Sequence, residues 1–174
     1  MTWKSFHRRG EILRTAIATA DRRRDGLLPM DVDGVAETFG DEVSLLGALQ
    51  LRWHTRLAGR IERELMNEPM DLERGVIAAW QGTAEELPGI RAIVDHYRHE
   101  PVDEAMAEMM TKSAAKEHIL LAVMAGRVSA QDATAARVGE AIEASARATF
   151  RPIRPAAEPS AHGLLDRIKA ALAA

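Results

Sequence analysis

Three polar side chains, predicted to lie on the apolar faces of helices, are the best candidates for chemistry in this sequence. On a helical wheel, Gln50 and His54 share a side with Leu57 and Ile61, and Glu117 lies at the centre of a second apolar stripe. A buried carboxylate costs on the order of several kcal/mol unless a cation or donor pairs with it. We therefore expect Glu117 to have an internal partner, with His54 or Gln50 as the candidates. The trio would either tie helices together or form a ligand-binding or catalytic pocket.

The motifs that mark the common catalytic and cofactor-binding classes are missing from the sequence. It has no glycine-rich phosphate loop, no Gly-x-Ser-x-Gly turn and no Glu-x-x-His pair. It has no cysteine, which excludes disulfides, thiolate catalysis and Cys-ligated metal sites. His54, His96 and His99 have the residue types for a three-histidine metal site but lack a diagnostic spacing. We therefore predict no catalytic residue and no metal site, and the sequence identifies no cofactor.

Four arginines at helical steps form a second candidate surface, which we call the arginine strip: Arg52, Arg56, Arg60 and Arg63. Their only good partner on the same helix is Glu64, four residues after Arg60. Residues 1–66 carry 11 Lys and Arg against 10 Asp and Glu, whereas residues 67–150 carry 8 against 14. We predict that the strip pairs with the acidic region, in the same or another subunit. Because even the arginine-rich third is nearly neutral, nucleic-acid binding is not expected.

The element that must position these side chains is a long helix over residues 41–66. Asp41 can cap its start, and its apolar residues recur at three- and four-residue steps: Leu46, Leu49, Trp53, Leu57, Ile61 and Leu65. Helical periods also cover residues 5–24, 33–39, 71–97, 101–126 and 129–150. The last of these has small inward positions that permit close packing: Ala135, Val138, Ile142 and Ser145. We predict an all-α bundle of five or six helices, mostly up-and-down.

The composition changes beyond residue 150. Pro152, Pro155 and Pro159 interrupt a short linker, and Leu164, Leu165, Ile168 and Leu172 then form one face of a brief amphipathic helix. We predict a bundle domain over residues 1–150, followed by this linker and helix over residues 151–174. A helix this short is marginal in water. It is expected to dock on its own body, on a second subunit or on a partner protein, with self-docking as the default.

The order of helix, short helix and long helix at the start of the chain resembles the N-terminal part of TetR-type repressors. The residues that carry the resemblance are Ile12, Leu13 and Ala16, then Val35 and Ala36, then Phe39 to Glu42 with Leu45 and Leu46. It covers about a third of the chain and implies a DNA-binding regulator. However, only Glu37 and Thr38 separate Ala36 from Phe39, which leaves no room for the recognition helix that those repressors place in the major groove. A degenerate regulator without that helix is therefore one alternative.

The composition sets the remaining functional expectations. With 47% hydrophobic and 28% charged residues the chain is typical of globular proteins. No apolar run approaches the length of a membrane span, and the absence of cysteine fits a reducing cytoplasm. The preference for Arg and Ala favours a GC-rich bacterial source. Our leading hypothesis is a small cytoplasmic, non-enzymatic protein that acts through protein–protein association, as a homo-oligomer. The alternative is a helical-bundle binder of a small ligand or metal, or an enzyme, that uses His54, Gln50 and Glu117.

Overall fold

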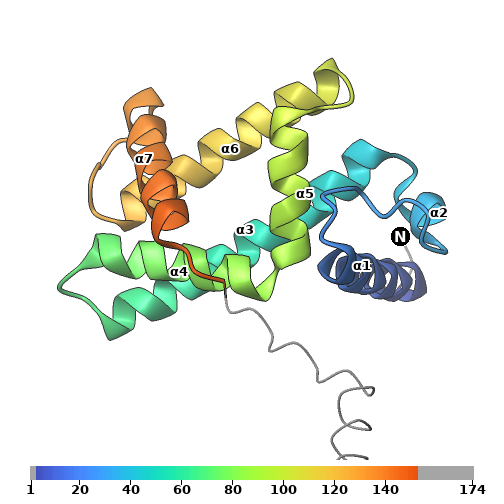
Figure 1. Cartoon of the computed structure of the whole chain (residues 1–174), viewed down its shortest axis with the longest axis horizontal. Coiled ribbons are helices and arrows are strands. Elements are labelled where there is room, and N and C mark those ends of the chain that lie inside the picture. Colours follow the sequence, from blue (N-terminus) through green and yellow to red (C-terminus); the bar gives the residue numbers. More distant parts are fainter. Residues whose placement is uncertain (1–2, 153–174) are drawn as a thin grey trace, which may run out of the picture.

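The computed structural model describes residues 3–152, and side chains from residue 7 onward; within this range the chain forms seven helices and no strand. The predicted all-α class is therefore confirmed (Figure 1). In chain order the helices are α1 (Trp3–Arg23), α2 (Val35–Phe39), α3 (Glu42–Asn67), α4 (Leu72–Glu86), α5 (Pro88–His99), α6 (Glu104–Met124) and α7 (Ala133–Thr149). None of these helices is long and apolar enough to cross a membrane.

Helix α3 is the centre of the bundle, as its apolar period predicts. Asp41 caps it by accepting a hydrogen bond from the Ser44 backbone N–H at 2.7 Å. The side of α3 that faces the other helices is completely buried at Leu45, Leu46, Leu49, Trp53, Leu57 and Ile61. Helix α3 contacts every other described helix except α7, and it extends from the α4 side of the molecule to the α1–α2 side (Figure 1). The side chains of α3 are therefore placed against most of the core.

The apolar period continues through residues 71–97, but the structure divides this segment into two helices. Helix α4 ends at Glu86, and Pro88 is the first residue of α5. Proline has no backbone N–H to continue the ladder, so the chain turns here and a new helix starts. Gly89 then packs against α1 so closely that a Cβ atom would lie 2.3 Å from the Ala20 carbonyl carbon. The turn at Pro88 sets α5 across the bundle, where it faces α1, α3 and α6.

Helices α6 and α7 form an antiparallel pair joined by residues 125–132. The backbones touch: a Cβ atom on Gly139 would lie 1.8 Å from the carbonyl oxygen of His118. The predicted close packing of α7 is therefore present, but the predicted phase is slightly wrong. Ser145 is exposed, whereas Glu143 and Ala146 are buried. The side of α7 that faces α6 is the side that carries Gly139, because only glycine allows the two backbones to come so near.

Between α1 and α3 the described chain forms only α2, which is five residues long. The predicted lack of space for a second helix in this stretch is thus confirmed. The three apolar residues of the C-terminal candidate surface, Leu164, Leu165 and Ile168, lie outside the described residues, as does most of the proline-rich linker. The division into a bundle and a C-terminal linker and helix stays a prediction.

Candidate functional site

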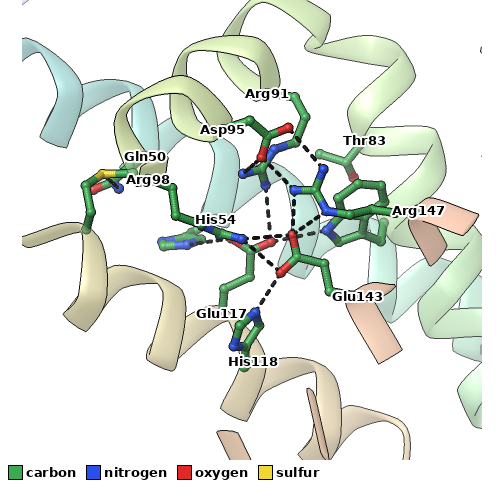
Figure 2. Close-up of polar contacts among 12 residues, drawn as sticks. Gln50, His54, Thr83, Arg91, Asp95, Arg98, Glu117, His118, Glu143 and Arg147 are labelled. Atoms are coloured by element: carbon green, nitrogen blue, oxygen red, sulfur yellow. Dashed lines mark hydrogen bonds and ion pairs between the residues drawn. The ribbon is translucent and has the colours of Figure 1, made fainter. Parts of the chain in front are cut away.

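Glu117 of α6 is buried in the middle of the bundle, at 2% exposure, as the helical wheel predicts. Its Oε1 accepts a hydrogen bond from Trp80 Nε1 at 3.2 Å and lies 3.5 Å from Arg91 Nη1. Its Oε2 lies 3.4 Å from His54 Nε2 on α3 (Figure 2). The structure therefore brings His54 and Glu117 together, and it adds an arginine that the sequence analysis did not find.

The partners of Glu117 keep it ionised. Burial alone raises the pKa of this carboxyl, but the hydrogen bond with His54 and the positive charge of Arg91 outweigh burial and hold the pKa below its ordinary value. A carboxylate that already contacts Trp80, His54 and Arg91, and that is almost completely buried, is suited to fixing its neighbours in place. It does not line either of the two large grooves described below.

Arg91 is the cation at the centre of the site, and it is 6% exposed. Its guanidinium lies over two indole rings, 4.8 Å from the Trp53 centroid and 5.8 Å from the Trp80 centroid. Its Nη2 donates to Asp95 Oδ1 at 2.7 Å, whereas its Nε and Nη1 make no hydrogen bond. The faces of the aromatic rings attract the cation and replace part of its lost hydration. Arg91 thus joins Glu117 to Asp95.

A second buried carboxylate, Glu143 of α7, lies on the other side of α6 from α3, at 3% exposure. It accepts from Arg98 Nη1 at 3.1 Å and from Arg147 Nη2 at 2.6 Å, and its Oε2 lies 2.6 Å from His118 Nε2. Burial raises the pKa of Glu143, but the hydrogen bond with His118 and the charges of Arg98, Arg91 and Arg147 outweigh it and hold the pKa far below its ordinary value. Glu143 is therefore ionised despite its burial.

Asp95 connects the two buried carboxylates through arginines. Its Oδ1 lies 2.6 Å from Arg147 Nη2 and also accepts from Arg91. Burial raises the pKa of Asp95, but its bonds with Arg147 and the charge of Arg91 bring the pKa below its ordinary value. The result is a continuous series across four helices, in which five alternating charges have a histidine at each end. We call it the charge chain (Figure 2): His54, Glu117, Arg91, Asp95, Arg147, Glu143 and His118.

Gln50, the third predicted member of the polar trio, does not reach Glu117. It is 6% exposed, and its Nε2 donates to the sulfur of Met110 at 2.9 Å. A thioether is a weak acceptor, so this contact satisfies the amide poorly. Of the two predicted partners of Glu117, the structure supports His54 and not Gln50.

Gln50 and His54 do share a groove between α3 and α6, which we call the α3–α6 groove. Its volume is about 480 Å³, and it is lined by Gly47, Gln50, Leu51, His54, Ala105, Glu108, Met109, Lys112, Ser113 and Lys116. Lys112 forms an ion pair with Glu108, whereas Lys116 has no ion pair within the described residues. Ser113 makes no hydrogen bond with His54 in this part of the chain. The groove therefore offers an imidazole, an amide, a hydroxyl and an uncommitted ammonium group.

A larger groove, which we call the α5–α7 groove, lies on the opposite side of α6. Its volume is about 780 Å³, and Arg98, His118, Glu143 and Arg147 line it. The remaining lining is mixed: Asp95, His99, Thr111, Arg137 and Glu140 are polar, whereas Pro101, Met110 and five alanines are apolar, the alanines being Ala107, Ala114, Ala115, Ala136 and Ala144. The charge chain thus begins at a histidine in one groove and ends at a histidine in the other.

The arginine strip is only partly paired. Arg56 Nε donates to Glu86 Oε2 at 2.8 Å, and Arg60 Nη2 donates to the same oxygen at 3.2 Å. These contacts confirm that the strip pairs with the 67–150 region, here within one chain. Arg52 and Arg63 are exposed and have no ion pair within residues 7–152. They remain the part of the strip that is open to a partner.

The described residues contain no group of three or more His, Cys, Asp and Glu side chains that could hold a metal ion. No model of a known protein family matches the chain, and comparisons with curated proteins and with solved structures give no match either.

Proposed function

We propose that this is a non-enzymatic binding protein that holds a small organic anion in the α3–α6 groove. The observation that carries the proposal is the position of His54 between that groove and the buried Glu117, 3.4 Å from its carboxylate. A protonated imidazole donates from both ring nitrogens. Glu117 fixes the ring by accepting from Nε2, which leaves Nδ1 for a carboxylate or phosphate oxygen of the ligand.

The rest of the groove suits the same ligand class. Lys112 and Lys116 face one acidic residue, Glu108, so the rim carries a net positive charge. The Gln50 amide and the Ser113 hydroxyl can orient polar groups, while Leu51 and Met109 can cover an aliphatic or aromatic body. A volume of about 480 Å³ lies within the range of small-molecule sites, roughly 300–1,000 Å³.

The arrangement favours binding over catalysis. A histidine that acts as a base for acyl transfer needs a nucleophile within hydrogen-bond reach. Ser113 is in the same groove but makes no hydrogen bond with His54 in the described part of the chain. Glu117 is buried in contact with Trp80, His54 and Arg91 and lines neither groove, so it cannot reach a substrate. These features support positioning roles for both residues.

The test is a binding titration of the full chain with small carboxylates and organic phosphates, read by calorimetry and by the rise in melting temperature. His54→Gln and Lys116→Gln should each weaken binding by at least about tenfold, because the first removes the ring nitrogen proposed to meet the ligand and the second removes a positive charge. Arg52→Gln is the matched control, since Arg52 is on the same helix, is exposed and does not line the groove. Equal affinity in all three variants would exclude this groove as the site.

Association with a second protein or a second copy is the other candidate function, and an exposed apolar cluster favours it. Met66, Met70 and Leu72, around the turn from α3 to α4, are 81%, 96% and 37% exposed. Arg63 lies nearby on α3 without an ion pair in the described chain. An apolar patch with a charged margin is typical of association surfaces. Sedimentation of the full chain tests this: a dimer that Met70→Lys dissociates supports it, and a monomer at all concentrations contradicts self-association. We expect either function in the cytoplasm of a bacterium.

A further inference from the structure

The α5–α7 groove requires a different occupant from the α3–α6 groove. Its inner charges already neutralise each other, since Glu143 pairs with Arg98 and Arg147, and Asp95 pairs with Arg147. Arg137 and Glu140, one of each sign, also line the groove and have no ion pair within the described residues. The apolar surface that remains open between them is mainly the alanine methyls. Small side chains on two packed helices leave a trough into which a third helix can fit. The groove therefore suits an apolar helix better than a free ion.

We propose that this groove is filled by the chain's own C-terminal segment, residues 164–172, docked within the same molecule. The first reason is where the chain leaves the bundle. Helix α7 is one wall of the groove, Arg147 lines its end, and α7 stops at Thr149. The chain therefore leaves α7 at the Arg147 end of the groove, and Phe150 then packs against Trp80 of α4, so that the connection to residue 164 begins beside the groove and not inside it.

The lengths of the groove, of residues 164–172 and of the connection before them allow the C-terminal helix to lie along the groove. Along α7 the lining runs from Ala136 to Arg147, which is about 16 Å at 1.5 Å per residue. As a helix, residues 164–172 are about 13 Å long. The connection over residues 150–163 can span up to roughly 45 Å when extended. It is long enough to pass the groove and bring the helix back along α7.

The chemistry of the segment also fits. Leu164, Leu165, Ile168 and Leu172 share one side of the predicted helix, and this side can meet the alanine methyls. Lys169 borders that side, and Glu140 on the groove rim has no ion pair within the described residues. Residues 151–174 carry 4 Lys and Arg against 2 Asp and Glu, whereas residues 67–150 carry 8 against 14. The segment and the body therefore attract each other.

Because the protein has no cysteine, pairs of introduced cysteines can test the contact in the full chain. Ala144→Cys, which is exposed and lines the groove, is combined in turn with Leu164→Cys, Leu165→Cys and Ile168→Cys. Ala78→Cys, exposed on α4 and outside the groove, is the matched control with the same three partners. All variants are first checked for an unchanged melting temperature.

Mild oxidation should form an intramolecular disulfide with at least one Ala144→Cys pair, at least about tenfold faster than with the Ala78→Cys control. A disulfide-linked dimer as the main product would show that the segment docks on a second copy, and rates equal to the control would show that it does not dock here. Either result overturns the proposal. No ligand is present in this experiment, so its outcome is independent of anion binding in the α3–α6 groove.

A readout without cysteines completes the test. Ile168→Asp should expose the groove methyls and increase the fluorescence of a bound hydrophobic dye severalfold, while Arg167→Asp, on the predicted outer side, should change it little. An unchanged signal in Ile168→Asp would contradict docking.

Discussion

The Glu143 carboxylate lies 2.6 Å from His118 Nε2 at the level where the backbones of α6 and α7 touch. The same approach that brings Gly139 against the His118 carbonyl places Glu143, one turn later on α7, beside the imidazole. A glycine is therefore what allows the second half of the charge chain to form.

We expect Gly139→Ala to destabilise the protein by about 3 kcal/mol, because its Cβ atom would lie 1.8 Å from the His118 carbonyl oxygen and the helices would have to separate. Urea denaturation measures the effect. Gly59→Ala on α3 is the control, since nothing lies within 4 Å of the added Cβ. Alanine favours a helix over glycine, so the control should be neutral or slightly stabilising. Equal effects of the two substitutions would contradict the packing described for α7.

The second prediction concerns the pairing of His54 with Glu117. Glu117→Leu leaves Arg91 buried with less compensating charge, so we expect a loss of about 3 kcal/mol in the free energy of unfolding. Glu117→Gln and His54→Gln should each cost roughly 1–2 kcal/mol, and the double variant should cost less than their sum. The measurement is a double-mutant cycle by chemical denaturation. Neutral or stabilising behaviour of Glu117→Leu would show that the charges are not coupled.

The third prediction is a loss of stability in acid. The pKa values of Glu143, Glu117 and Asp95 are lower in the folded protein than their ordinary values, because bonds and charges from histidine and arginine outweigh the effect of burial. Their contribution is fully present above about pH 4.5 and is lost as the pH falls through the lowered folded-state values. Urea denaturation between pH 7 and pH 3 should show this decline.

Glu143→Gln should flatten that decline, because the neutral amide removes one of the three carboxyls whose pKa is lowered in the folded protein. Glu104→Gln is a control, since Glu104 is exposed and makes no ion pair within the described chain. A pH dependence that is the same in Glu143→Gln and in the wild type would contradict the assignment.

The fourth prediction concerns nucleic acid. Two of the four arginines of the strip are held by Glu86, and α2 is too short to enter a groove of DNA as a recognition helix. Binding to duplex DNA should therefore be weak, independent of sequence and absent near physiological salt. Fluorescence anisotropy at several salt concentrations checks this. Tight, sequence-selective binding at that salt would favour the regulator alternative.

The sequence is sufficient to predict the helices, the role of α3 and the burial of Glu117 beside His54, because a polar residue in an apolar stripe is visible on a helical wheel. It is not sufficient to predict the rest of the charge chain. In the sequence, Arg91 lies at the edge of an apolar stripe. Its guanidinium is buried because it lies over the rings of Trp53 and Trp80, and the sequence does not show that these two helices meet there. Glu143 was missed because the phase of α7 depends on the contact at Gly139. A charged inner face could have been suggested by the helical spacing of the charged residues on α5 and α7. These are Arg91, Asp95 and Arg98 on α5, and Glu143 and Arg147 on α7.

The charge chain also has a consequence for how this protein can diverge. Each internal member lies beside at least one residue of opposite sign on another helix, so a change at one position leaves an unbalanced charge in the core. Substitutions should therefore be inherited in pairs that keep the sum of charges, with Glu117 changing alongside Arg91 and Asp95 alongside Arg147. Among distant homologues, we expect these positions to vary together across helices that are far apart in the chain, while the alanines that line the α5–α7 groove vary independently of them.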